Sequence, residues 1–161
     1  MTGQWPTAEV DQISRLRALA AGVSGATVTE RVVDADFNTA WTLLSDFEGA
    51  FGFIEPDMRR VRVALRDGDR IELDARSRWG FRAHLVGVHR PGWFWVQSRF
   101  LLIGIAAAAQ PDGRTRVALT GGVRVPGRAA LLVPIGVRRA ACSALDRLEH
   151  QLGQHDARPH G

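Results

Sequence analysis

The sequence predicts an α+β fold in which a curved, antiparallel seven-stranded sheet wraps around a long C-terminal helix. Three patterns predict it. Apolar residues recur at helical spacing over 37–45. From Met58 to Val125 apolar and polar residues alternate, which is typical of half-buried strands. After Pro126-Gly127 the helical spacing returns and continues to Leu152.

The first 25 residues are interpreted as an N-terminal helical extension. Helical spacing over 7–21 places Thr7 as the expected N-cap. The apolar positions of this helix are Val10, Ile13, Leu16 and Ala20. Residues 27–33 are rich in β-branched side chains and predict the first strand. Asp36 is a good N-cap for the next helix, which we expect to end near Ser45.

Six further strands are expected in the central region, separated by turns such as Asp67-Gly68 and 111–113. Because the connections are short, consecutive strands should pair as an antiparallel meander. The expected strands lie around 61–65, 71–79, 81–89, 93–101, 103–109 and 115–125.

The last helix is predicted from an apolar stripe whose opposite face carries arginines and acids. The stripe consists of Ile135, Cys142, Leu145, Leu148 and Leu152. Gly153 is the expected C-cap, and we expect 153–161 to be a flexible tail. The sequence thus predicts one domain over 26–152 between the N-terminal extension and this tail.

Composition narrows the classes of function. A chain of 161 residues with 45% hydrophobic content suits one globular domain. All 21 basic residues are arginine, against 17 acidic residues, for a net charge of +4. The arginines alternate with acids, as in 70–76, which indicates a salt-bridged surface rather than a nucleic-acid footprint. Cys142 is the single cysteine, so neither an internal disulfide nor a paired-cysteine metal site can form.

We expect a cytoplasmic protein. Residues 15–26 have a basic start, but the stretch after Arg17 holds only Leu19 and Val23 as large apolar residues, too few for a signal peptide. The apolar runs 101–109 and 129–135 fall well short of the roughly 20 residues that span a bilayer. No integral membrane segment is expected, and the chain should be a monomer or homodimer.

Several short segments carry a resemblance to a known family. They are VVDAD at 32–36 followed by Ala40-Trp41, the passage from SDF at 45–47 through FIEP at 53–56 to VRV at 61–63, the turn HRPG at 89–92, and PDGRTRV at 111–117. In their order and spacing these segments resemble the START-like superfamily, also called SRPBCC, which has the helix-grip fold. The resemblance covers about residues 26–152. It implies a cavity between the concave face of the sheet and the C-terminal helix. It implies no single activity, because the family holds transporters, receptors, cyclases, hydrolases and Rieske oxygenase domains.

Strand alternation indicates which side chains would face that cavity. In the favoured register, alternate residues of each strand point inward. They are Val61, Val63, Ile71, Leu73, Ala75, Ser77, Trp79, Phe81, Ala83, Leu85, Gly87, Phe94, Val96, Ser98, Phe100, Val117, Leu119, Val123 and Val125. From this set and the two helices we predict a ligand-binding set of Trp41, Phe51, Phe53, Leu73, Ala75, Ser77, Trp79, Phe94, Ser98, Phe100, Leu119, Cys142 and Leu145. Small residues such as Ala75 would leave room for a ligand, although tight packing under large aromatic side chains is the alternative.

The predicted cavity favours binding over catalysis. Its polar groups would be Ser77, Ser98 and Cys142, with no carboxylate, histidine or lysine. Such a cavity can hold an apolar molecule but is poorly equipped for general acid–base chemistry. We therefore expect binding, or transport, of a small hydrophobic ligand such as a lipid, isoprenoid or polyketide, with no cofactor.

The sequence also allows two alternatives to the binding of a hydrophobic ligand. A one-residue shift of register would turn Arg82, His84, Gln97 and Arg99 inward. A cofactor-free polyketide cyclase or aromatase would then use Arg82, His84 and Arg99 as its catalytic residues. Alternatively, Trp93 and Trp95 form an aromatic platform for a protein partner, unless they stack under Arg82 or Arg99 on the convex face.

A metal site is not expected. His84 and His89 are five residues apart on one strand and must face opposite sides of the sheet. The chain has neither an HExxH motif nor a cluster of histidines and carboxylates in sequence.

Overall fold

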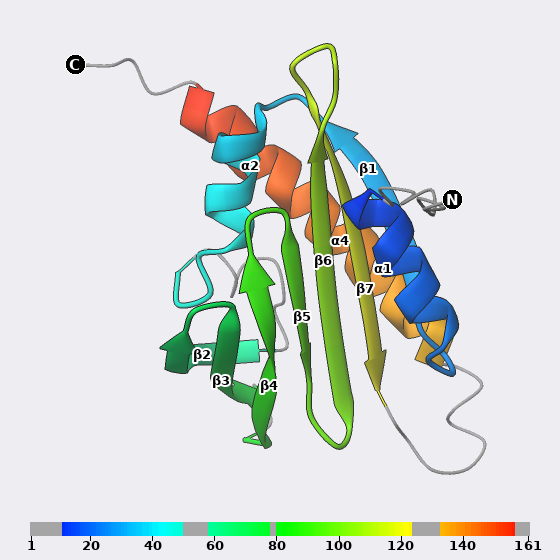
Figure 1. The fold of residues 1–161 in the computed structure, drawn as a ribbon, viewed down its shortest axis with the longest axis vertical. Coiled ribbons are helices and arrows are strands. Elements are labelled where there is room, and N and C mark those ends of the chain that lie inside the picture. The colour runs from blue at the N-terminus through cyan, green and yellow to red at the C-terminus, as the bar shows by residue number, and fades with distance from the viewer. Residues whose placement is uncertain (1–10, 50–57, 78–79, 124–132, 157–161) are drawn as a thin grey trace, which may run out of the picture.

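A computed structural model describes residues 11–49, 58–77, 80–123 and 133–156 of the chain, and it has the predicted α+β fold (Figure 1). Its elements in chain order are α1 (Gln12–Ala21), β1 (Thr27–Val33), α2 (Phe37–Leu44), β2 (Met58–Asp67), β3 (Arg70–Ser77), β4 (Arg82–Arg90), β5 (Trp93–Gln97), β6 (Leu101–Ala109), β7 (Thr115–Val123) and α4 (Val133–Asp156).

The described strands form one antiparallel seven-stranded sheet in the order β1-β7-β6-β5-β4-β3-β2. Strands β2 to β7 make the predicted meander, and β1 joins it by pairing with β7. The sheet is curved, so that β2 and β3 lie at a steep angle to β6 and β7 (Figure 1). Irregular register in β2, between Met58 and Arg60 and between Val63 and Leu65, accompanies the curvature, as bulges bend a strand.

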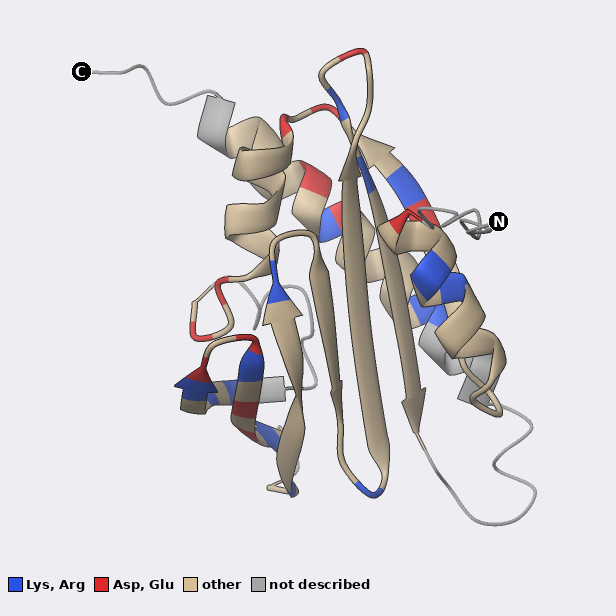
Figure 2. Ribbon diagram, viewed as in Figure 1, with Lys and Arg blue, Asp and Glu red and all other residues tan. Residues whose placement is uncertain are grey.

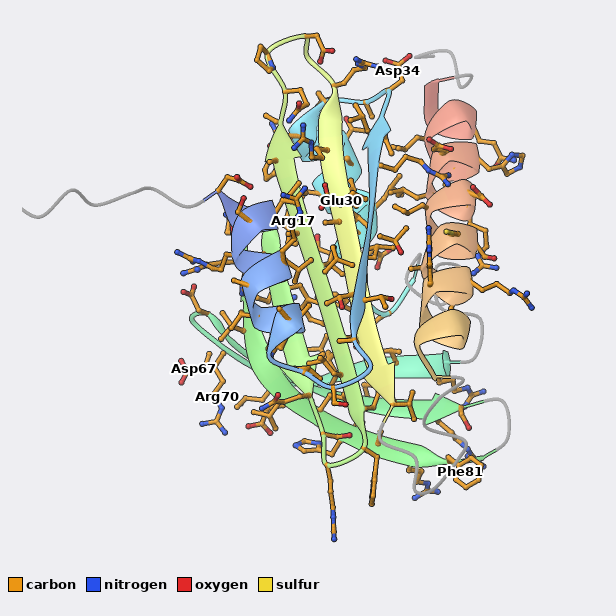
Figure 3. All side chains as sticks on the ribbon, turned by 90° about the vertical axis from the view of Figure 1, so that its right-hand side faces the viewer. Arg17, Glu30, Asp34, Asp67, Arg70 and Phe81 are labelled. Atoms are coloured by element: carbon orange, nitrogen blue, oxygen red, sulfur yellow. The ribbon has the colours of Figure 1, made fainter. Side chains whose placement is uncertain are left out.

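The two faces of the sheet are covered by different helices. Figure 3 shows α4 on one face, called here the inner face, and α1 on the opposite, outer face. The main core lies on the inner face, where α2 and α4 meet the sheet. Two ion pairs hold α4 to the edge strand β1, because Arg31 Nη1 lies 2.5 Å from Asp146 Oδ1 and 3.0 Å from Glu149 Oε2.

Helix α1 is seated on the outer face by a second, smaller core. Ile13 and Leu16 are buried there against Trp93, Ala106 and Ala118. The predicted apolar stripe is therefore confirmed for the described part of this helix. Asp11 caps it, and its Oδ1 accepts hydrogen bonds from the backbone nitrogens of the second and third helical residues. The predicted cap Thr7 lies outside the described residues.

Gly104 in β6 provides the space that α1 requires. A Cβ atom at this position would lie 2.9 Å from Leu16 Cδ1 and 3.0 Å from Trp95 Cε3, closer than side chains normally approach. Glycine thus lets the helix sit directly on the strand. The ion pair of Arg17 with Glu30 on β1, labelled in Figure 3, fastens the exposed side of the helix.

Element boundaries differ from expectation in two places. Strand β5 ends at Gln97, where a strand to Leu101 was predicted, because the Ser98 hydroxyl accepts hydrogen bonds from two backbone nitrogens and closes a turn. Helix α4 continues through Gly153 to Asp156, so the predicted C-cap is wrong. Leu152, which is 6% exposed, anchors this end of the helix in the core and outweighs the weak helix propensity of one glycine. Asp36 caps α2 as predicted.

Among the described residues, no helix combines the length and the apolar character needed to cross a membrane.

The seat of α1 generates a stability prediction. Leu16→Ala should lower the free energy of unfolding by about 2–4 kcal/mol, because it leaves a cavity above Gly104 and Trp95. The matched control is Leu19→Ala on the exposed side of the same helix, which should change stability by less than about 0.5 kcal/mol. Urea unfolding followed by tryptophan fluorescence measures both. Equal effects of the two substitutions would contradict the seating of α1.

Candidate functional site

The inner face has the register that the sequence favoured. In β3, Ile71, Leu73 and Ala75 are buried and alternate with residues on the outer face. In β4, Leu85 is buried, and Ala83 packs against the same core. The apolar residues of β4 therefore face inward, and the one-residue shift that would turn Arg82 and His84 inward does not occur.

Six residues of the predicted ligand-binding set come together on this face. They are buried in one cluster between the sheet, α2 and α4, which also includes Ile103 and Ile105 from β6. The six are Trp41, Leu73, Ala75, Phe94, Leu119 and Leu145. Predicted residues Phe51, Phe53 and Trp79 lie outside the described residues. Cys142 is half-buried on α4 with a free thiol.

Three predicted residues have other roles at strand ends. Ser77 uses its hydroxyl to accept a hydrogen bond from the backbone nitrogen of Phe81, 3.1 Å away. Ser98 closes the β5–β6 turn in the same manner. Phe100 follows in that turn with 59% of its surface exposed and the Arg99 guanidinium 5.4 Å from its ring centre. Assigning Phe100 to the cavity wall was therefore wrong, because β5 ends three residues before it.

His89 is the residue that the sequence analysis missed. It pairs with Phe94 across β4 and β5, and directly paired residues share a face, so its ring points inward. The ring stacks on Trp41 at 5.7 Å with an interplanar angle of 11° and meets the edge of Phe47 at 5.3 Å. The alternation that directs Ala83 and Leu85 inward extends to this position. The expectation of an inner face without histidine is therefore wrong.

One nitrogen of His89 is left without a partner. Nε2 is buried and accepts or donates no hydrogen bond among the described residues. Burial lowers the pKa of His89 below its ordinary value of 6.5, and the positive charge of Arg66 lowers it further, while Asp69 opposes this effect. At neutral pH the imidazole is uncharged, with one nitrogen able to donate and the other to accept a hydrogen bond.

The residues of the cyclase alternative do not gather on the inner face. His84 is exposed on the outer face, where Nδ1 lies 2.8 Å from Asp74 Oδ1 and Nε2 lies 3.2 Å from Glu72 Oε2. The hydrogen bond to Asp74 is the main cause that raises the pKa of His84 above 6.5. Arg82 is exposed two residues earlier on the same face, and Arg99 lies in the β5–β6 turn. The three groups therefore cannot act together inside the sheet.

The tryptophan platform is covered by the chain itself. Trp93 and Trp95 stack at 6.5 Å on the outer face, and Trp93 is 4% exposed beneath α1. The cation over Trp93 is Arg15 of α1, at 5.8 Å, rather than the expected Arg82 or Arg99. This pair serves to hold α1 on the sheet.

No group of three or more His, Cys, Asp or Glu side chains in the described parts of the chain is arranged to hold a metal ion.

Comparisons with known proteins bear on the fold. Neither protein-family models nor curated protein sequences give a match. Solved structures do. The protein TTHA0849 of Thermus thermophilus superposes with a TM-score of 0.61 at 18% identity, covering 82% of this chain and 99% of that one.

Two further neighbours have informative names. The Zhui aromatase/cyclase of Streptomyces sp. R1128 gives a TM-score of 0.60 at 15% identity, over 84% of this chain and 98% of that one. A START superfamily protein of Mycobacterium smegmatis gives 0.56 at 17% identity, over 80% and 97%. At these identities the likeness is one of fold. With its seven-stranded curved sheet and long C-terminal helix, this chain has the START-like helix-grip fold.

Proposed function

We propose that the chain binds a small, largely apolar molecule, such as a lipid, isoprenoid or polyketide, between the inner face of the sheet and α4. The observation that carries the proposal is the chemistry of the inner face. Aliphatic or aromatic side chains line it on every strand from β3 to β7, and its polar side chains are His89 in the aromatic cluster and, at strand ends, Ser77 and Thr115, whose hydroxyls hydrogen-bond to the backbone. A largely apolar surface with few polar groups is the usual lining of a small-molecule site.

Small side chains on both sides of this face support the proposal. Ala75 and Ala83 lie opposite each other on β3 and β4, and Ala141 and Ala144 face the core from α4. An alanine fills less volume than a leucine at the same position, so these sites reduce the packing between sheet and helix. The neighbours named as an aromatase/cyclase and a START superfamily protein share this arrangement of sheet and helix.

His89 supplies the specificity that an apolar face lacks. A ligand carbonyl or hydroxyl that reaches its ring would satisfy an imidazole nitrogen that has no partner among the described residues. A buried polar atom without a hydrogen bond costs about 1–3 kcal/mol, so pairing it would favour ligands that carry one polar group.

Proton transfer by His89 is the second candidate function. An uncharged imidazole next to a substrate can act as a general base. Arg82 and His84 on the outer face and Arg99 in the β5–β6 turn are not placed to reach a substrate on the inner face. The likeness to an aromatase/cyclase favours this candidate.

The first test is recovery of the ligand. Mass spectrometry of an organic extract of protein purified from its native host should give an apolar molecule near one equivalent per chain. Incubating that molecule with fresh protein distinguishes the two functions, because binding returns it unchanged and catalysis converts it. Repeated recovery of no small molecule would contradict both.

A second prediction concerns the space on the inner face. Ala83→Phe should weaken the binding of the apolar fluorescent probe N-phenyl-1-naphthylamine by about tenfold or more, because the ring occupies space next to Ala75. Val86→Phe, three residues along the same strand and on the outer face, is the matched control and should leave binding unchanged. Fluorescence titration measures both, and thermal unfolding checks folding. Equal affinities of the two variants would contradict the proposed site.

The two histidines of β4 should have pKa values shifted in opposite directions from the ordinary value of 6.5. Imidazole NMR resonances should give a pKa below 6.5 for His89 and above 6.5 for His84. Because folded His89 binds protons less readily than unfolded His89, its contribution to stability should fall as pH drops below about 6.5. For His84 the sign is reversed, so its contribution is present at low pH and is lost as pH rises through its folded pKa.

His89→Phe provides the control, since it keeps an aromatic ring beside Trp41 and removes the titration. Loss of stability on acidification should be smaller in this variant than in the unmodified protein. A pKa of His89 at or above 6.5 would contradict its burial in the aromatic cluster.

A further inference from the structure

Three chain segments lie at the same end of the sheet, which we call the basic end. They are the described part of the β3–β4 connection with its flanking residues (75–77 and 80–83), the β5–β6 turn (97–102), and the end of β7 (119–123). Antiparallel pairing sets Arg76 opposite Arg82 and Leu101 opposite Val123, and the β4–β5 ladder that joins the two hairpins ends at the pair Val86–Gln97. The strand ends concerned lie at the lower edge of the sheet in Figure 1.

Large apolar side chains are exposed at this end. Phe81 is 75% exposed and Phe100 is 59% exposed, the two highest values among the large hydrophobic residues described. Val123, which is 45% exposed, lies at the end of β7 opposite Leu101, the residue that follows Phe100. Figure 3 shows Phe81 at the lower end of the molecule, below α4 and on the opposite side from α1. Aromatic rings that are exposed at strand connections add nothing to the packing of the fold, and grouped apolar surface of this kind often marks an interaction site.

The same end carries positive charge without acids. Arg76 and Arg82 are directly opposite each other and exposed, and like charges in such a pair repel. Neither these two nor Arg99 has an ion-pair partner in the described structure. The described residues of the basic end contain no Asp or Glu.

Arginines elsewhere on the described surface vary in their pairing. Arg17, Arg31, Arg62, Arg70 and Arg114 each have a carboxylate within 3.1 Å, whereas others, such as Arg66, Arg90 and Arg116, have no ion pair among the described residues. Acidic residues gather toward the opposite end of the sheet, at the β2–β3 and β6–β7 turns and around the start of α2 (Figure 2). The unpaired arginines of the basic end thus lie where the phenylalanines are exposed.

We propose that the basic end docks on an anionic lipid bilayer. Phe81 and Phe100 would enter the interface between headgroups and acyl chains, and Arg76, Arg82 and Arg99 would contact lipid phosphates. Two rings held on separate turns can each enter a fluid surface, whereas a folded protein partner would need a continuous complementary face. Anionic membranes attract basic side chains near the surface, and apolar insertion adds to this attraction. This proposal does not depend on the proposed ligand.

Vesicle sedimentation tests the proposal with the full chain. The protein should bind vesicles of equal parts phosphatidylcholine and phosphatidylglycerol, and binding should weaken with added salt. Phe81→Ser with Phe100→Ser should lower the partition coefficient by about tenfold or more. Arg82→Gln with Arg99→Gln should lower it by roughly fivefold for each charge removed.

Matched controls separate docking from general effects of charge and hydrophobicity. Arg70→Gln with Arg114→Gln removes the same charge at the opposite end of the sheet and should keep most of the binding. Leu19→Ser with Leu65→Ser removes exposed apolar residues elsewhere and should do the same. Circular dichroism checks that each variant is folded.

Several results would overturn the proposal. These are no binding to anionic vesicles, equal binding to vesicles of phosphatidylcholine alone, or equal losses in the controls and in the basic-end variants. Tighter binding to single-stranded DNA than to vesicles, or a dimer that the phenylalanine variants dissociate without any vesicle binding, would assign the basic end to another partner.

Discussion

Burial of the sheet on both faces is the constraint on which the structure depends. Strands β6 and β7 contribute side chains to the core under α4 and to the smaller core under α1. Because alternate residues point to opposite faces, one register decides both cores at once, and a shift by one residue would exchange them. Leu16 above Gly104 fixes the outer side of this arrangement, and Leu145 and Leu148 occupy the inner side.

The same constraint separates the chemistry of the two faces. On β3 and β4, which α1 does not cover, the outer positions hold charged pairs such as His84 with Asp74, while the inner positions are apolar except for Ser77 and His89 at strand ends. The proposed ligand site would therefore use mainly apolar contacts together with the imidazole of His89. Charged groups act at the outer face and at the ends of the strands, where a membrane or another partner can reach them.

Sequence patterns predicted most of the fold because alternation in β3 is nearly perfect and both α2 and α4 carry clear apolar stripes. They failed where local signals are ambiguous. Serine occurs in strands and in turns, so Ser98 gives no clear signal in the sequence. In the structure its hydroxyl accepts a backbone hydrogen bond that closes a turn, and Phe100 in that turn is exposed to solvent. His89 continues the inward alternation of Ala83, Leu85 and Gly87, but a histidine at the end of a strand followed by a turn gives no apolar signal that would place it in the lining. The seat of α1 could not be predicted, since an amphipathic helix does not specify which face of a sheet it covers.

Nuclear Overhauser contacts between methyl-labelled protein and bound N-phenyl-1-naphthylamine would locate an apolar ligand on one face of the sheet. If the ligand lies between the sheet and α4, contacts should join the probe to methyl groups of the inner face, such as Leu73, Leu119 and Leu145. Contacts confined to outer-face methyl groups such as Val86 and Val88 would contradict binding at the inner face, because they would place the probe on the face that carries the charged pairs and α1.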